Sequence, residues 1–200
     1  MRNVTRTVAL ASTAVMLAAA APALAHDRGF ESVRVDHELR PVQVDSVSKA
    51  SGEARIRTLP NDMLHVRVRV EGLTPGSVLH MQHLHGFPGA PDLGCPSMQA
   101  TPLADADGDG LISVAEGAPF FGPVQVHLNS TGATDTSGDY AVADARGRIR
   151  YERTFSTTAA NVMMAERFQV VVHGIDLDRD GMLEAGTEFS IPAVCGGSAN

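Results

Sequence analysis

The strongest constraint on the fold is a strict alternation of apolar and polar residues between Leu64 and Val70. Every even position in this segment is leucine or valine, and every odd position is histidine or arginine. Successive side chains of a β-strand point to opposite faces, so the pattern buries one face and exposes the other. A helix would scatter the same side chains around its axis. We therefore predict a half-buried strand here.

Seven further segments are predicted to be short strands, because they are apolar or alternating and turn-forming residues separate them. They are Val33–Leu39, Ala54–Leu59, Val78–His85, Val124–Leu128, Arg148–Phe155, Phe168–Ile175 and Glu188–Val194. Eight such strands are typical of an all-β fold, an antiparallel Greek-key sandwich or barrel. The one helix predicted is Ala159–Arg167. The connection 86–121 is too long for a plain loop, so we expect this insertion to carry function.

The first 25 residues read as a signal peptide. Arg2 and Arg6 precede an apolar run, Val8–Ala21, and Ala23-Leu24-Ala25 resembles a cleavage site. The run is short for a membrane span, and no later segment reaches the roughly 20 apolar residues that a span needs. We therefore expect residues 26–200 to form a single exported domain, secreted or held in the periplasm or cell envelope. A membrane anchor is the alternative.

The composition of the chain limits the classes of partner that it can bind. The chain has a formal net charge of −7, no tryptophan and 4% aromatic residues. An acidic chain repels a phosphate backbone, and few aromatic rings are available to stack on bases. The sequence thus argues against a nucleic-acid partner and favours metal ions. Without the first 25 residues the net charge becomes −9, because that segment carries two arginines and no acids.

The chain has two cysteines, Cys95 and Cys195. In an oxidising compartment they are predicted to form one disulfide that links the insertion to the end of the chain. Two buried free thiols are the alternative.

Residues 105–116 match the EF-hand calcium loop at every ligand position. Gly110 allows the sharp turn at the sixth position, and the crowded carboxylates repel one another unless a cation neutralises them. Ca²⁺ accepts seven oxygen ligands more readily than octahedral Mg²⁺ does. An acidic, solvated loop without an ion is the alternative. The predicted ligands are Asp105, Asp107, Asp109, the Leu111 carbonyl, Ser113 and bidentate Glu116.

The flanks of this loop, Pro102 before it and Gly117-Ala118-Pro119 after it, predict a truncated helix–loop–helix unit. A second acidic stretch follows the seventh predicted strand. Its twelfth position is threonine and a glutamate stands one place later, so the bidentate ligand is missing or displaced. An acidic turn is the alternative to a second calcium site. The ligands of that second site would be Asp176, Asp178, Asp180, Met182, Glu184 and Glu188.

Three histidines form the other candidate metal site. His83 and His85 share one face of a predicted strand, about 6–7 Å apart, while His80 faces the other way. His173 ends the apolar run 170–172. Three imidazoles suit copper or zinc. A polar strand face without an ion is the alternative.

Several short motifs resemble the copper-zinc superoxide dismutase family, in the family's order over roughly residues 54–197. They are Leu73-Thr74-Pro75-Gly76 followed by Leu79-His80-Met81-Gln82-His83-Leu84-His85, then Gly94-Cys95-Pro96-Ser97, Val171-Val172-His173 and Val194-Cys195-Gly196. The resemblance implies that fold, copper ligation by His83, His85 and His173, a structural role for His80 and a Cys95–Cys195 bridge.

The chain also departs from that family. Residues 98–101 contain no histidine in place of the metal-bridging ligand, and the zinc-loop histidines are missing, so no zinc site is implied. Pro192 stands where the family has an anion-guiding arginine. A net charge of −9 without that arginine gives the wrong field for rapid dismutation.

A second resemblance is to secreted CHRD β-sandwich domains. It rests on Gly52-Glu53-Ala54-Arg55-Ile56, the central histidine pair and the segment 122–128, whose His127 we expect at the surface. Three hypotheses follow. The first is an exported, calcium-stabilised, dismutase-like β-sandwich with a degenerate copper site. The alternatives are a copper-dependent superoxide dismutase and a non-catalytic envelope or matrix module that binds a protein partner.

Overall fold

A computed structural model describes residues 30–76, 78–89, 93–131 and 139–197. The predicted signal peptide lies outside these residues. The described part contains one antiparallel sheet of eight strands in the order β5-β4-β7-β8-β1-β2-β3-β6. The strands are β1 (Arg34–Pro41), β2 (Ser51–Leu59), β3 (Met63–Glu71), β4 (Gln82–His85), β5 (Val124–His127), β6 (Ile149–Ser156), β7 (Gln169–His173) and β8 (Pro192–Gly196).

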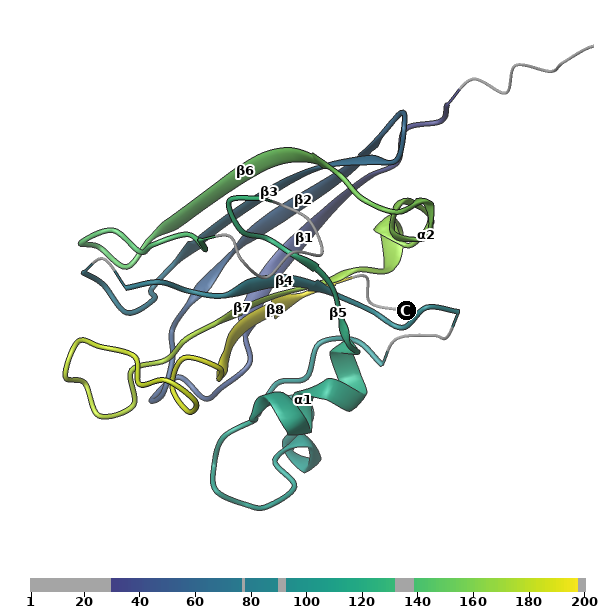
Figure 1. Cartoon of the computed structure of the whole chain (residues 1–200). Coiled ribbons are helices and arrows are strands. Elements are labelled where there is room, and N and C mark those ends of the chain that lie inside the picture. The colour runs from purple at the N-terminus through teal and green to yellow at the C-terminus, as the bar shows by residue number, and fades with distance from the viewer. Residues whose placement is uncertain (1–29, 77, 90–92, 132–138, 198–200) are drawn as a thin grey trace, which may run out of the picture.

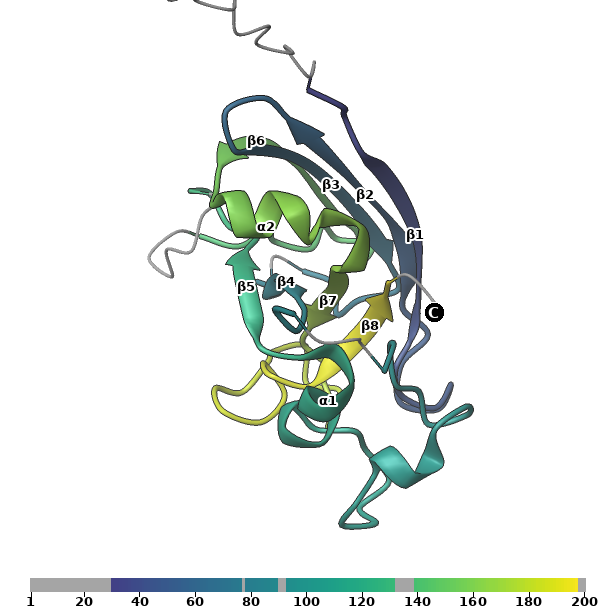
Figure 2. The ribbon, with the colours of Figure 1, turned by 90° about the vertical axis from the view of Figure 1, so that its right-hand side faces the viewer.

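The sheet curls into a half-barrel, so β1, β2, β3 and β6 face β4, β7 and β8 (Figures 1 and 2). The prediction of an all-β antiparallel fold is confirmed, with one curled sheet in place of two separate ones. The main core fills the concave side. In β3 the alternation works as predicted, because Leu64, Val66 and Val68 are fully buried there. The β2–β3 hairpin turns through Asn61 and Asp62, both with positive φ, which suits the twist of paired strands.

Two predicted strands differ most from the observed boundaries. Residues 78–81 are not a regular strand, although Leu79 forms an isolated bridge with Val142. The last strand begins at Pro192 and not at Glu188, because the Glu188 carboxylate accepts backbone hydrogen bonds inside an acidic loop. The predicted helix is present in two pieces, α2 (Ala159–Met163) and the 3₁₀ turn η2 (Ala165–Arg167).

The insertion forms a second, smaller core on the convex side of the sheet. It contains the 3₁₀ turn η1 (Pro102–Ala104) and the helix α1 (Val114–Phe121). The buried members of this core are Val42, Ala104, Ile112, Phe121, Val171 and Cys195. The predicted disulfide is present and joins Cys95 of the insertion to Cys195 of β8, with 5.6 Å between the two Cα atoms. The insertion is thus fastened to the face of β7 and β8.

The sequence predicted a truncated helix–loop–helix unit, but a regular helix, α1, does follow the acidic loop. Ser113 and Glu116 form a reciprocal capping box that starts the helix. Gly117 is required because the Phe121 ring lies over it, and a Cβ at position 117 would come within 2.3 Å of that ring. On the N-terminal side only the turn η1 precedes the loop. No helix of the described part is long and apolar enough to cross a membrane.

Candidate metal centres

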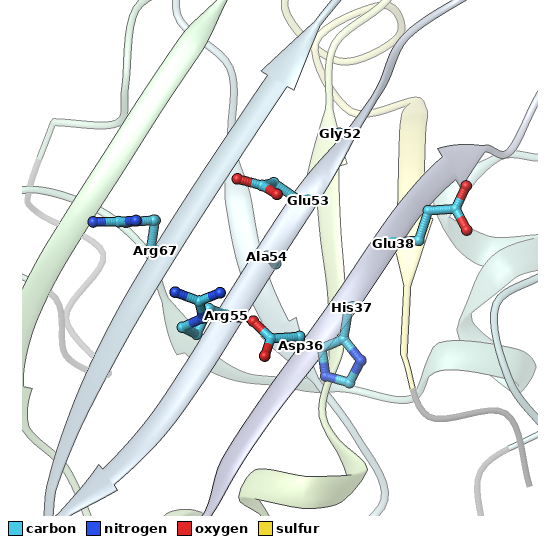
Figure 3. Close-up of a pocket in the computed structure, with 8 residues that line it drawn as sticks. All are labelled: Asp36, His37, Glu38, Gly52, Glu53, Ala54, Arg55 and Arg67. Atoms are coloured by element: carbon cyan, nitrogen blue, oxygen red, sulfur yellow. Dashed lines mark hydrogen bonds and ion pairs between the residues drawn. The ribbon is translucent and has the colours of Figure 1, made fainter.

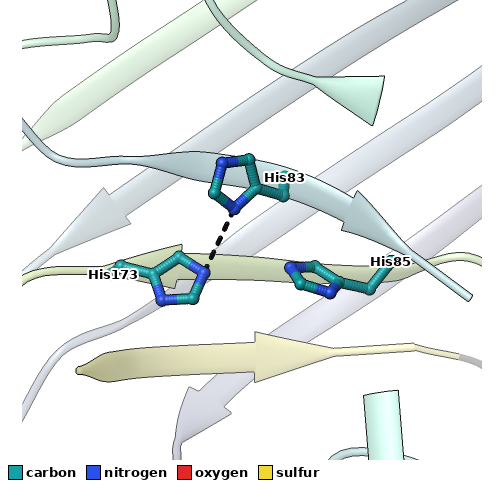
Figure 4. Close-up of side chains that lie close together, drawn as sticks. All are labelled: His83, His85 and His173. Atoms are coloured by element: carbon teal, nitrogen blue, oxygen red, sulfur yellow. Dashed lines mark hydrogen bonds between the residues drawn. The ribbon is translucent and has the colours of Figure 1, made fainter. Parts of the chain in front are cut away.

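Three histidine rings converge on the convex face of β4 and β7 (Figure 4). His83, His85 and His173 each offer one ring nitrogen, and these nitrogens lie within 4.8 Å of one another. The antiparallel pairing sets this arrangement, because His83 is opposite Val171 and His85 is opposite Gln169. All three residues are buried, with exposed fractions of 6% or less. They form a group that could hold a metal ion, and we call it the histidine trio.

Backbone carbonyls fix two rings of the trio. His85 Nδ1 lies 2.8 Å from the carbonyl oxygen of Gly122, the residue that ends α1. His173 Nδ1 lies 2.7 Å from the carbonyl oxygen of Ser190. A carbonyl only accepts, so each Nδ1 carries the proton and each Nε2 keeps a lone pair. His85 Nε2 is buried and has no hydrogen-bond partner among the described residues.

Burial keeps the three rings neutral, which metal ligation requires. Desolvation, together with smaller contributions from the neighbouring histidines, lowers the pKa of His83 to about 2. Desolvation lowers the pKa of His85 to about 3 and that of His173 to about 4. Each ring therefore keeps one nitrogen lone pair at neutral pH. The structure brings together all three predicted copper ligands.

Sequence reasoning missed two residues beside the trio. His127 of β5 pairs directly with His83, so both side chains are on the same face, and their ring centroids are 4.8 Å apart. The expectation that His127 is a surface residue is therefore wrong, because it is half-buried against His83. The Tyr140 hydroxyl lies 2.6 Å from His127 Nδ1 and 3.1 Å from His83 Nε2. The alternation in residues 124–128 predicts that His127 lies on the strand face that points away from the main core. That His83 is its neighbour on this face follows only from the register of β4 and β5.

His80 occupies a different place. Its Nδ1 lies 2.9 Å from the carbonyl oxygen of His173, and its Nε2 lies 3.3 Å from that of Thr74. Burial lowers its pKa. His80 thus contacts the backbone at the end of β7 and is not one of the three converging rings.

The first acidic loop is folded around its own carboxylates. Asp105, Asp107 and Glu116 bring oxygens within 4.8 Å of one another. Glu116 Oε1 accepts hydrogen bonds from the N–H groups of Ala106 and Asp107, and its Oε2 accepts from the Ser113 backbone and hydroxyl. These bonds, led by the Ser113 backbone N–H, lower the pKa of Glu116 to about 2.

The remaining predicted ligands of this loop take other contacts. Asp109 Oδ1 accepts the N–H of Leu111 at 2.8 Å and lies outside the three-carboxylate group. Ser113 caps α1. Among the described residues, no hydrogen bond places the Leu111 carbonyl at the centre of the loop. The adjacent residue Ile112 is held by Gln43, whose side-chain amide bonds both its N–H and its carbonyl, each at 2.9 Å.

The second acidic loop repeats this hydrogen-bond pattern. Gly181 donates to Asp176 Oδ2 at 2.9 Å, as Gly110 donates to Asp105 at 3.0 Å. Met182 donates to Asp180 at 2.8 Å, in the place of the Leu111–Asp109 bond. Glu188 accepts the N–H groups of Leu177 and Asp178, as Glu116 does in the first loop.

Glu188 therefore takes the position of Glu116 although it stands one residue later, so the bidentate carboxylate is displaced and not missing. Asp176, Asp178 and Glu188 form one group of oxygens within 4.8 Å, and Asp178, Asp180 and Glu184 form another. A hydrogen bond to the Glu188 carboxylate raises the pKa of Glu184 to about 7. Such crowding is the condition that a cation relieves.

A pocket of about 360 Å³ lies elsewhere, on β1, β2 and β3 (Figure 3). Asp36, Glu53, Arg55 and Arg67 line it, and Asp36 pairs with Arg55. Its charges are paired and do not converge on one centre. We therefore place the functional site at the trio and the two loops.

Comparison with known proteins adds no family. A scan against protein-family models and a search of curated proteins found no significant match to this chain.

Proposed function

We propose that this chain is an exported metal-binding β-domain of the superoxide dismutase-like kind, with copper at the histidine trio and calcium in both acidic loops. The observation that carries the proposal is the convergence of three neutral, buried imidazoles. His85 Nε2 in particular is buried without a protein partner in the described part of the chain. A buried polar atom without a partner is destabilising, and a metal ion at this place removes that penalty.

The trio fits copper by the chemistry of its donors. Imidazole nitrogens suit copper and zinc, and hard ions such as Ca²⁺ prefer oxygen. Copper would supply one-electron redox chemistry when bound. The residues of the chain hold the rings in place, because the carbonyls of Gly122 and Ser190 fix the protons of His85 and His173. Such outer hydrogen bonds orient metal-binding histidines and raise their basicity.

The two loops fit calcium by the chemistry and order of their oxygens. Each one gathers carboxylates from its first, third and final ligand positions. The first loop and the helix α1 that follows it also reach the convex core, because Ile112 of the loop and Phe121 of α1 are fully buried there. Calcium in this loop would therefore fasten the insertion over β7 and β8, together with the Cys95–Cys195 bridge.

Superoxide dismutation is the second candidate, favoured by the three-histidine set itself. The acidic net charge and Pro192 in place of an arginine oppose it, because both disfavour the approach of a small anion. The copper-loaded protein distinguishes the two. Activity no greater than that of free copper, or activity unchanged in His83→Ala, would remove the enzymatic candidate.

The test of the proposed function is metal content and metal affinity. Elemental analysis of protein from the export compartment should give copper and calcium. Competition titration should show copper affinity lost in His85→Gln and retained in His65→Gln, a matched change on the exposed face of β3. Equal affinities in these two variants would refute the copper site. Native protein that contains calcium but no copper would indicate a calcium-binding module without a redox metal.

A further inference from the structure

The trio is supported differently on the side that faces β5. His85 and His173 are each fixed by a backbone carbonyl. His83 is held differently. Its two ring nitrogens contact His173 Nε2 at 3.3 Å and the Tyr140 hydroxyl at 3.1 Å. His83 is therefore the ring of the trio that side chains hold, and its proton position depends on them.

We propose that Tyr140 and His127 are positioning residues that set which nitrogen of His83 carries its proton, and that this proton order reverses when the trio is loaded. The proposal rests on the proposed metal site at the trio. It concerns a chain of three hydrogen-bonding side chains, from His83 through the Tyr140 hydroxyl to His127 Nδ1, which lies 2.6 Å from that hydroxyl.

In the metal-free protein the order of donors follows from His173. Its Nδ1 donates to Ser190, so its neutral Nε2 offers only a lone pair. His83 Nδ1, at 3.3 Å, satisfies that lone pair by donating to it. His83 Nε2 then accepts from the Tyr140 hydroxyl, and the Tyr140 oxygen accepts from His127 Nδ1. Each group donates once in this order.

Loading requires the opposite order. His83 can ligate through Nδ1 only when Nδ1 carries no proton, so the proton of the neutral ring must be on Nε2. His83 Nε2 then donates to the Tyr140 oxygen, and Tyr140 donates to His127 Nδ1. His83 Nδ1 releases one proton to solvent and His127 Nε2 takes one up, so the net proton count of the three groups is unchanged.

Tyr140 suits this role because a hydroxyl both donates and accepts and its hydrogen can rotate between two partners. Phenylalanine in its place keeps the ring and removes both bonds. The chain offers a matched control, because Tyr151 is the other tyrosine of the sequence. The Tyr151 hydroxyl is buried on the concave side and has no partner among the described residues.

The test uses ¹⁵N long-range NMR of the histidine rings, with and without Cu⁺ under anaerobic conditions, because Cu⁺ is diamagnetic. In the wild type, His83 and His127 should change from Nδ1–H to Nε2–H on loading, while His85 and His173 stay Nδ1–H. In Tyr140→Phe, His127 should no longer respond, and Cu⁺ affinity should fall by about 10- to 100-fold. Tyr151→Phe should match the wild type in both measurements.

The outcomes separate the two proposals. If the wild type binds Cu⁺ no better than His85→Gln does, the copper site is wrong. The spectra of the metal-free protein then still test the proposed proton order of His83, Tyr140 and His127. The proposed order is supported if His83 and His127 both carry their proton on Nδ1 in the metal-free wild type, and if His127 loses this preference for Nδ1 in Tyr140→Phe. A His83 ring that already carries its proton on Nε2 without metal overturns this proposal. Where the wild type binds Cu⁺ more tightly than His85→Gln does, equal Cu⁺ affinity in Tyr140→Phe and the wild type also overturns it.

Discussion

The substitution Gly122→Ala tests whether the insertion holds His85 in place. Gly122 follows α1 with φ of 79° and ψ of −178°, a region of backbone space that is essentially restricted to glycine. Its carbonyl accepts the hydrogen bond from His85 Nδ1 at 2.8 Å. One backbone position thus ends a helix of the insertion and orients a ligand of the trio.

The magnitude follows from two contributions. A non-glycine residue in this region costs about 1–3 kcal/mol. A Cβ at position 122 would also lie 2.8 Å from the carbonyl carbon of Gly86 and 2.9 Å from its oxygen, so backbone must move. Together we expect about 2–4 kcal/mol of lost stability, which lowers the melting temperature by roughly 4–16 °C in a domain of this size. The displaced carbonyl should weaken copper affinity by about 10- to 100-fold.

Calorimetry and competition titration measure the two effects, and Gly89→Ala is the control. Gly89 has φ of 77°, but a Cβ there meets nothing within 4 Å. This control should cost about 1–2 kcal/mol and leave copper affinity unchanged. The reasoning is refuted if Gly122→Ala is no less stable than Gly89→Ala, or if both variants bind copper as the wild type does.

Three further predictions follow from the supports around the trio. Replacing Cys95 and Cys195 together by serine should lower the free energy of unfolding by up to about 4.7 kcal/mol, since the bridge spans 100 positions; an unchanged urea midpoint would contradict this. Glu188→Gln should remove calcium binding by the second loop in calorimetric titration while Glu184→Gln retains most of it, and equal losses would show that Glu188 is not the counterpart of Glu116. The metal-free protein should lose stability as the pH falls from 6.5 towards 4. Burial lowers the pKa of His173 to about 4 and that of His85 to about 3. In this pH range the unfolded chain therefore binds protons that the native chain excludes. Urea midpoints at pH 7.5, 5.5 and 4.5 check this, and midpoints that do not fall would oppose it.

The strands could be predicted because each one carries a local signal, such as the alternation in β3 or the apolar run in β7. Burial of alternate residues in β3 needs no knowledge of its neighbours, and the same holds for the histidine spacing in β4. The first acidic loop is equally local, because all the calcium ligands predicted for it lie within residues 105–116. The disulfide followed from having one pair of cysteines.

Features that depend on register or packing could not be predicted. His127 reaches the trio only because β5 pairs with β4, and Tyr140 reaches it from a segment outside the strands. The helix α1 contains glycine and proline, which individually disfavour helix, and the packing of Phe121 over Gly117 outweighs that tendency. Glu188 is one residue late in sequence, yet a slightly longer loop carries it to the equivalent place.

The acidic loops and the histidine trio share their supports. Gly122, whose carbonyl holds His85, ends the helix α1 that follows the first loop. Ser190, whose carbonyl holds His173, comes two residues after Glu188, the last predicted ligand of the second loop. The side-chain amide of Gln43 joins the first loop to the start of β8 through the carbonyls of Ile112 and Pro192. If calcium binds as proposed and orders either loop, we therefore expect it also to favour the conformation in which a trio histidine presents Nε2. Such linkage is reciprocal, so copper at the trio would then raise the calcium affinity of the loops by the same factor.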